Sequence, residues 1–342
     1  MKRIHHVSER LASALGMAAF LALLTVLFIW TGPSRVQAQT QEQTLPHVPM
    51  SDATSIWGGF QPSGWATTTA PACSVIVTDS LGLEEATAVY RYSANGGSSW
   101  SAWSSAGLSI SGDTDTTKYI TVTGVTFIQS GTDNLIQFRI LDLNGDPDTS
   151  PVFVVKVDSQ APAAPTGLAV SPAGWSPTNS FTLTWTNPAD TSGIAGVYYK
   201  LDAPPTSSGD GTLVEGAGIS SLSSLIVSGN GAHPIYIWLK DSAGNANHST
   251  HASATLYLDQ DLPSAPSAIT STTHSTAAWS QDNYVQVNWS GASDPTSGIA
   301  GYAVAWDQSP GTLPAPITTT IGLTGTSPIL PDGSSHYAHL RA

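Results

Sequence analysis

The pentapeptide Ser192-Gly-Ile-Ala-Gly196 is repeated as Ser297-Gly-Ile-Ala-Gly301, and this repeat decides the fold. The residues around it also match, at an offset of about 101 to 105 residues. The matching pairs are Trp185 with Trp289, and Tyr236-Ile-Trp-Leu-Lys240 with Tyr337-Ala-His-Leu-Arg341. Because order and spacing hold along the whole unit, the chain contains tandem modules of about a hundred residues.

Each module is patterned as β-strands. Phe181, Leu183 and Trp185 alternate with threonines, and Val285, Val287 and Trp289 alternate with polar residues. A period of two places the apolar side chains on one face of a strand, as expected where that face packs on a core. Short β-branched runs separated by Gly and Pro turns continue to residue 342, with no helical periodicity after the first 38 residues. This pattern predicts an all-β fold of antiparallel sandwiches.

Three stretches of the second module carry a resemblance to a known family. Residues 181–188 resemble the second strand of a fibronectin type III module with its core tryptophan, and residues 196–200 resemble the third strand. Residues 236–245 resemble the sixth strand and the turn after it. The array is similar to the fibronectin type III or immunoglobulin-like repeats of large bacterial surface and secreted proteins, over most of residues 160–342 and more weakly over 60–158. The resemblance implies a fold and leaves function open, because such sandwiches have many roles.

The repeat divides the chain into segments. We expect a signal peptide or anchor at 1–38, a linker at 39–59, a diverged module at 60–158, and fibronectin type III-like modules at 159–259 and 260–342. The third module stops where the second continues into a final hairpin, so we expect the last module to be truncated. The Pro-rich segments 158–165 and 259–266 join the modules and are expected to be short, stiff linkers.

The first 38 residues read as an export segment. Lys2, Arg3 and Arg10 give a positive start, Leu11 to Trp30 is almost wholly apolar, and Val36-Gln-Ala38 offers small residues to a signal peptidase. An apolar run of about 20 residues is also long enough to span a bilayer, so an uncleaved anchor is the alternative. Either outcome predicts that the rest of the chain is secreted or lies at the cell surface.

Charge and cysteine content limit the partners. The formal net charge is −13, and residues 1–38 hold four basic residues and one acid, so the exported part is more acidic still. A polyanion repels the phosphate backbone, so we expect no nucleic-acid partner. The single cysteine, Cys73, excludes an intrachain disulfide and is expected to be a buried residue of the strand Cys73-Ser-Val-Ile-Val-Thr78.

One loop has the spacing of a weak calcium site. Its candidate ligands alternate along the chain as in the first half of an EF-hand loop: Asp142, Asn144, Asp146 and Asp148. Pro147 and Phe153 occupy the places where that loop needs glycine and a bidentate acid. An ordinary turn like Asp241-Ser-Ala-Gly-Asn245 is therefore the main interpretation, and calcium binding is the alternative.

No pattern in the chain indicates catalysis. The sequence has no Gly-x-Ser-x-Gly elbow, no His-Glu-x-x-His motif and no phosphate loop. The pair His248 and His251 lies between expected strands without a third ligand, so it is expected to be a surface loop. Three tryptophans are expected to face the core and four are freer to stack on sugars: Trp185, Trp238 and Trp289 in the first group, and Trp57, Trp65, Trp100 and Trp103 in the second.

The sequence therefore favours a non-catalytic extracellular protein that acts as a spacer or as an adhesion and interaction array. Its partners are expected to be surface proteins or glycans, with a membrane only through the first segment if that is uncleaved, and no cofactor apart from the calcium alternative. The competing hypothesis is a carbohydrate- or calcium-binding accessory region of a larger exported enzyme whose catalytic domain lies beyond this chain.

Overall fold

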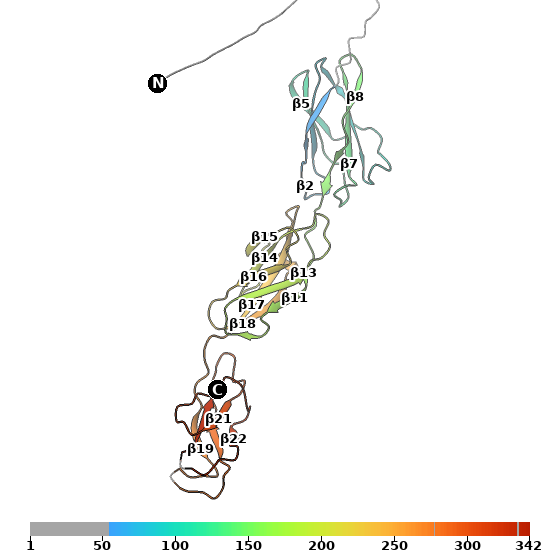
Figure 1. The fold of residues 1–342 in the computed structure, drawn as a ribbon. Helices are drawn as coiled ribbons and strands as arrows, with labels where there is room; N and C mark the ends of the chain where they lie inside the picture. Colours follow the sequence, from blue (N-terminus) through green and yellow to red (C-terminus); the bar gives the residue numbers. More distant parts are fainter. Residues whose placement is uncertain (1–54, 277, 334) are drawn as a thin grey trace, which may run out of the picture. The chain divides into compact units, whose positions relative to one another are not determined.

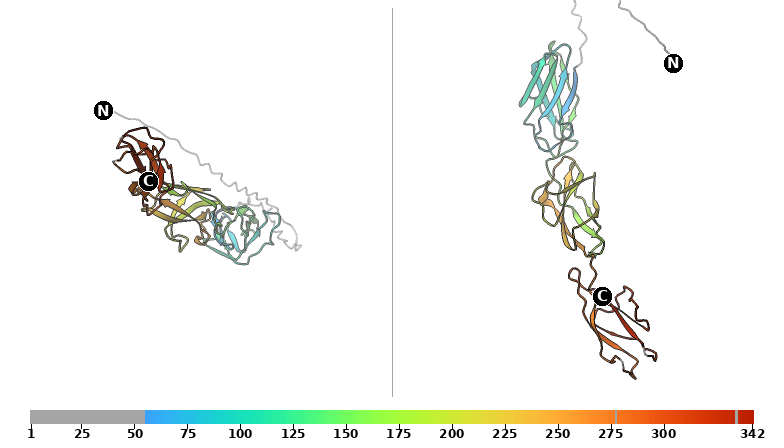
Figure 2. Two further views of the ribbon diagram at one scale, coloured as in Figure 1. Left: turned by 90° about the horizontal axis from the view of Figure 1, so that it is seen from below. Right: turned by 90° about the vertical axis from the view of Figure 1, so that its left-hand side faces the viewer.

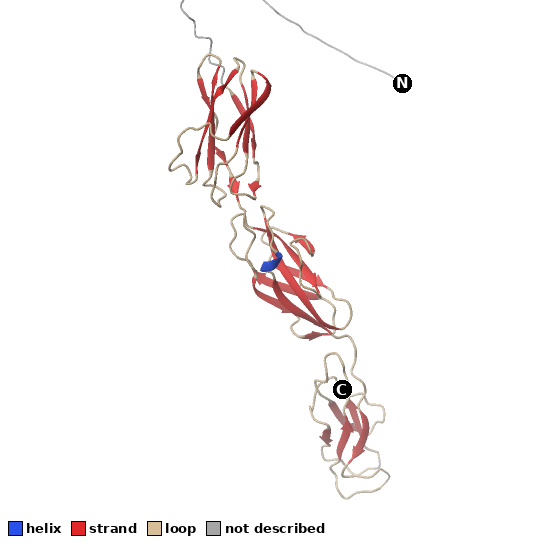
Figure 3. Ribbon diagram, turned by 180° about the vertical axis from the view of Figure 1, so that it is seen from behind, coloured by secondary structure: helices blue, strands red, loops and turns tan. Residues whose placement is uncertain are grey.

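The computed structural model describes residues 55–276, 278–333 and 335–342, and these are almost entirely strands and loops (Figure 3). The strands form three groups, each with its own hydrophobic cluster (Figures 1 and 2). The one helical segment in these ranges is the 3-10 turn η1 (His248–Thr250). The predicted all-β fold of tandem sandwiches is confirmed, and the predicted export segment lies outside the described residues.

Module 1 is a sandwich of two four-stranded sheets. One sheet has the order β1 (Ile56–Gln61), β3 (Cys73–Thr78), β6 (Thr117–Val122) and β5 (Leu108–Thr114). In the other, β4 (Leu83–Ser93) pairs with β7 (Leu135–Asp142), which also pairs with β8 (Pro147–Thr149) and β9 (Phe153–Val154). The short strands β2 (Trp65–Ala66) and β10 (Lys156–Val157) pair in parallel. The module begins at β1, a few residues before the expected boundary at 60.

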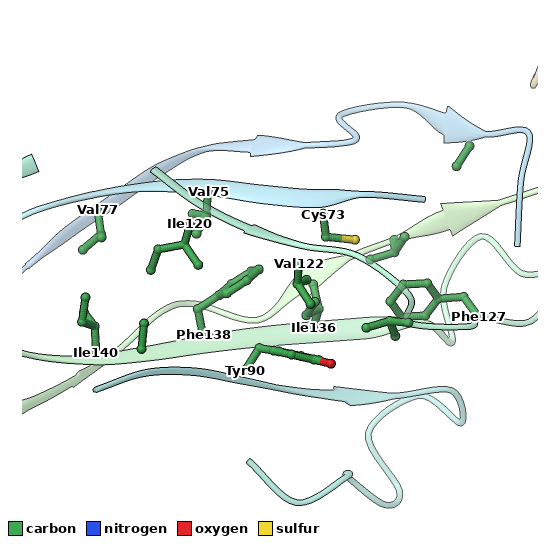
Figure 4. Packing of buried hydrophobic residues seen from close by; sticks show 14 of the residues in the cluster. Cys73, Val75, Val77, Tyr90, Ile120, Val122, Phe127, Ile136, Phe138 and Ile140 are labelled. Carbon is green, nitrogen blue, oxygen red and sulfur yellow. The ribbon is translucent and has the colours of Figure 1, made fainter. Parts of the chain in front are cut away.

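The core of module 1 follows from strict alternation in its strands. In β7 every second residue is buried, and Ile136, Phe138 and Ile140 are fully covered. They meet Val75 and Ile120 from the facing sheet, as Figure 4 shows. The two inner faces thus interdigitate as sandwich faces do.

Cys73 belongs to this core and has no exposed surface. Burial raises the pKa of its thiol to about 12, because the thiolate would lose its hydration. We expect the folded chain to resist a thiol-specific aromatic disulfide reagent at pH 8 and to react with one equivalent once denaturant unfolds module 1. Rapid labelling of the native chain would show that Cys73 is accessible.

Module 2 is a three-stranded sheet packed against a five-stranded one. The smaller sheet has the order β11 (Thr166–Ser171), β13 (Phe181–Thr186) and β16 (Ser221–Leu225). The larger has β12 (Trp175–Ser176), β18 (Ala252–Leu258), β17 (Gly231–Asp241), β14 (Ile194–Leu201) and β15 (Thr212–Glu215). This arrangement is the one that the fibronectin type III resemblance implies. Trp185 lies in the core between the sheets, as predicted.

Trp238 corrects the expectation that it faces the core. Its neighbours Ile237 and Leu239 belong to the core cluster, so alternation puts Trp238 on the outer face of β17. It is nevertheless fully buried, because Tyr198 stacks on its ring at 5.3 Å and a loop covers it. Its Nε1 donates to the carbonyl of Ser208 in that loop at 2.9 Å.

Module 3 has shorter strands and a smaller core. One sheet has the order β19 (Ser267–Ser271), β20 (Gln286–Ser290) and β22 (Thr324–Thr326), and the other pairs β21 (Ala303–Asp307) with β23 (Tyr337–Arg341). Its buried apolar residues are Val287, Trp289, Tyr302 and Ala303. Trp289 lies on β20 as Trp185 lies on β13, which confirms the predicted equivalence.

The register of the third module differs from that of the second. Lys240 lies opposite Gly196, whereas Arg341, its counterpart in the repeat, lies opposite Ala303 and not Gly301. The pairing has moved by two residues. A shift of two keeps every side chain on its original face, which is why the inward pattern survives.

Candidate functional site

Three carboxylates meet where the first joint enters module 2. Asp158, Asp190 and Asp241 each place one carboxylate oxygen within 4.8 Å of the other two. Asp158 follows β10, Asp190 precedes the repeated pentapeptide, and Asp241 ends β17. Asp158 and Asp241 are buried and Asp190 is half-buried. The sequence placed Asp241 in a turn but did not predict that the three acids meet.

Hydrogen bonds give these acids a structural role at the joint. The Asp158 carboxylate accepts the amides of Ser192 at 3.0 Å and Gln160 at 3.1 Å. Asn245 donates its side-chain amide to the carbonyl of Asp158 at 2.9 Å and to the carboxylate of Asp241 at 2.8 Å. The joint is therefore bonded to a loop and a hairpin of module 2, and charge-assisted bonds of this kind are the stronger ones.

The same pair of acids recurs at the second joint. Asp259 is the counterpart of Asp158, and Asp294 is the counterpart of Asp190. Asp259 is buried, and its side chain contacts that of Asp294. Ala342 stands at the position of Asp241, so in the described residues this second group has two acids. The pair of acids thus recurs with the repeat, whereas the hydrogen bonds of Ser192 and Asn245 to Asp158 belong to the first joint.

The pKa values of the counterparts Asp190 and Asp294 are shifted in opposite directions. Burial, together with the charges of Asp158 and Asp241, holds the pKa of Asp190 above its ordinary value. In contrast, backbone amides, that of Ser297 foremost, hold the pKa of Asp294 below its ordinary value. The ionised form of Asp190 is therefore disfavoured in the fold, whereas the ionised form of Asp294 is favoured.

We expect Asp190→Asn to stabilise module 2 at pH 7. A raised pKa means that the folded state binds the proton more tightly, so stability falls as pH rises through that pKa. Asparagine removes the charge and keeps an acceptor for the amides of Ser192 and Gly193. The gain over the wild type should vanish below pH 3.8, the ordinary pKa. Thermal unfolding across pH measures it.

The matched variant Asp294→Asn should behave in the opposite way. Its lowered pKa contributes stability above pH 3.8 that is lost as pH falls through the folded value. Asp294→Asn should therefore weaken module 3 at pH 7. If Asp190→Asn destabilised module 2 at pH 7, as Asp294→Asn is expected to destabilise module 3, the repulsion inferred at Asp190 would be contradicted.

The loop with the weak calcium candidates is organised as a turn. The Oδ1 atom of Asp142 accepts the amides of Asn144 and Asp146, both at 2.9 Å. Asn144 and Asp146 are exposed, whereas the Oδ2 atoms of Asp142 and Asp148 are buried without a hydrogen-bond partner in the described residues. These bonds agree with the turn interpretation. Calcium binding at the four residues stays a prediction.

The histidine pair lies in a loop, as the sequence suggested. His248 begins the 3-10 turn η1, and His251 follows it. Nδ1 of His251 lies 2.7 Å from the carbonyl oxygen of His248, so a backbone contact already occupies that ring nitrogen.

Two of the tryptophans that were expected to be available for stacking on sugars, Trp100 and Trp103, contact arginine side chains instead. The guanidinium of Arg91 lies 4.6 Å from the ring of Trp100 and 4.8 Å from that of Trp103. The guanidinium of Arg139 lies 4.6 Å from the ring of Trp103. The sequence did not predict this stacking of arginines on tryptophans, because the arginines lie on strands β4 and β7 and the tryptophans lie in a loop. Trp57 packs against the core of module 1, which also departs from the expectation.

No helix in the described part of the chain has the length and apolarity to cross a membrane. No protein-family model matches the chain, and no curated protein matches it significantly.

Solved structures are similar to this chain at low identity. The FN1-FN3 domains of chicken CNTN1 are 12% identical over 84% of this chain and 91% of theirs, with a TM-score of 0.28. The fibronectin(III)-like modules of Clostridium thermocellum CbhA are 15% identical over 59% of this chain and 94% of theirs, also with a TM-score of 0.28. On its own strand order, the described part of the chain is an array of β-sandwich modules, the architecture that the fibronectin type III resemblance implies.

Proposed function

We propose that this chain is a non-catalytic, exported modular protein that serves as a spacer and interaction array at the cell surface. The observation that carries the proposal is the recurrence of the joint contact, Asp158 with Asp190 and Asp259 with Asp294. A spacer needs each linker to be attached to the next module in a defined way. At the first joint, the side-chain amide of Asn245 provides that attachment by donating to the linker carbonyl of Asp158.

The chemistry of the described acids supports a structural role. Asp158 and Asp241 are buried and accept backbone and amide hydrogen bonds, so their oxygens are already used. Cys73 is buried with a thiol whose pKa is raised to about 12, which is the opposite of what a nucleophile needs. Both features suit a scaffold whose polar groups hold loops in place.

The second candidate is an accessory region of a larger exported enzyme that contacts carbohydrate. The specific observation in its favour is the surface of tryptophans and arginines on module 1. Under this hypothesis, antibody against module 1 should recover a hydrolase activity that resides on the same polypeptide. Under the spacer hypothesis, the recovered polypeptide has none.

Protease treatment of intact cells of the native host tests the proposed location. Antibody against module 2 should detect loss of the chain when protease is added outside, while a cytoplasmic marker survives. If the chain is degraded only after the cells are lysed, the surface role is wrong.

A further inference from the structure

The arginines and tryptophans of module 1 form a cationic surface in an acidic protein. We call Arg91, Arg139, Trp100 and Trp103 the Arg–Trp ladder. Arg91 on β4 contacts both tryptophan rings, and Arg139 on β7 contacts that of Trp103. All four side chains are half-buried. Contacts between guanidinium and aromatic rings hold the charges in place, so little rotamer freedom is left to lose on binding.

The loop that carries the tryptophans is fixed to the edge of β4. Tyr90 and Ser104 exchange two backbone hydrogen bonds of 2.9 Å, and the amide of Ser101 donates to the carbonyl of Tyr92 at 2.8 Å. The hydroxyl of Ser101 accepts the amide of Tyr92 at 3.0 Å. The rings are therefore held by backbone pairing as well as by the arginines.

The two guanidinium groups of the ladder have N–H donors that make no hydrogen bond within the described residues. Arg91 uses Nε and Nη2 on the side-chain oxygen of Gln137, at 3.0 and 2.7 Å. In the described ranges, the side chain of Arg139 makes no hydrogen bond and neither arginine makes an ion pair with a carboxylate. An arginine has five N–H donors in a planar fork that matches a carboxylate.

The strand positions directly beside the ladder carry no acid, whereas Asp133 contacts Gly96 in the loop that leads to Trp100. The outward positions that lie beside the two arginines on the paired strands are neutral: Val89, Leu135, Gln137, Thr149 and Val154. Glu84 on β4 lies opposite Leu141 on β7. Leu141 is the next outward-facing residue of β7 after Arg139. In a chain of net charge −13 this is a local positive surface, which favours an anionic partner.

The shape of the surface favours an extended ligand. One cavity lies beside Trp175 and another beside Tyr199, and neither is lined by residues of the ladder. The ladder lies on the outer face of a sheet, where a polymer could run across both arginines, which are diagonal neighbours on paired strands. Thr149, opposite Arg139, is exposed and offers a hydroxyl to a sugar.

We propose that the Arg–Trp ladder binds a carboxylated polysaccharide, with Arg91 and Arg139 pairing with successive uronate carboxylates. The tryptophans orient the arginines instead of stacking on the sugar. This inference rests on the proposed function and deepens it, because it names a partner class for one module of the array.

Binding of the full chain to polygalacturonate tests the proposal, by affinity electrophoresis and by calorimetry. The wild type should bind polygalacturonate and not the neutral polymer dextran, and added salt should weaken the binding. Arg139→Gln should weaken it about tenfold or more, because it removes a charge-assisted pair. Arg139→Lys should restore it only in part, because lysine lacks the planar fork.

Arg341→Gln is the matched control, since it removes the same charge from module 3. It should leave binding unchanged, and circular dichroism should show that all variants stay folded. Equal losses in Arg139→Gln and Arg341→Gln would overturn the ladder as the site. Absence of wild-type binding, or equal binding to polyglutamate, would overturn the polysaccharide assignment. None of these outcomes bears on whether cells display the chain, which the protease experiment measures separately.

Discussion

Replacing Trp185 by alanine is expected to lower the free energy of unfolding of module 2 by about 3–5 kcal/mol. Trp185 is 6% exposed and packs in the core between the two sheets. Its Nε1 donates to the side chain of Asn187 at 2.8 Å, so the substitution also frees a hydrogen-bonded group. A domain of this size is stable by about 5–15 kcal/mol, so the loss is a large share of the total. Chemical denaturation followed by circular dichroism measures it.

Trp175→Ala is the matched control for this substitution. Trp175 is 40% exposed and lies on the short strand β12, where it contacts Tyr257. Because far less surface is uncovered, its removal should cost much less. An equal loss in the two variants would contradict the assignment of Trp185 to the core.

Trp238→Ala is expected to have an effect of similar size, about 3–5 kcal/mol. The side chain is fully buried although it faces away from the core cluster. The substitution removes the stacking on Tyr198 and the bond to the carbonyl of Ser208. The loop around Gly211, which approaches the ring closely, should also lose its support. Denaturation measures the stability, and proteolysis of residues 203–211 reports on the loop.

The control for Trp238 is Trp279→Ala in module 3, whose ring is 84% exposed. It should change stability by less than about 0.5 kcal/mol, as is usual for surface positions. If Trp238→Ala left both the stability and the loop unchanged, the loop would not be held by this tryptophan.

Short-range pattern predicted the strands and the inner faces of β13 and β20, although it misplaced Trp238 on β17. The alternation in residues 181–186 reappears as the buried positions of β13. The repeated pentapeptide marks equivalent turns, because Gly193 and Gly298 both have φ of 80°. Such a φ strains other residues, so the repeat preserves glycine there.

Contacts between distant segments could not be predicted in the same way. Trp238 is covered by a loop about 30 residues away, and alternation gives no information about loops that fold over an outer face. The joint brings together Asp158, Asp190 and Asp241, whose spacing matches no local motif. The ladder likewise joins strand arginines to loop tryptophans, so the sequence suggested the tryptophans and missed the arginines.

Hydrogen–deuterium exchange of the full chain, wild type against Trp185→Ala, tests the central claim most directly. If the modules are separate sandwiches with separate cores, the variant loses protection in β11 to β18, while the strands of modules 1 and 3 keep theirs. A loss of protection of the same size in all three modules would show that they unfold as one unit and would contradict the modular account.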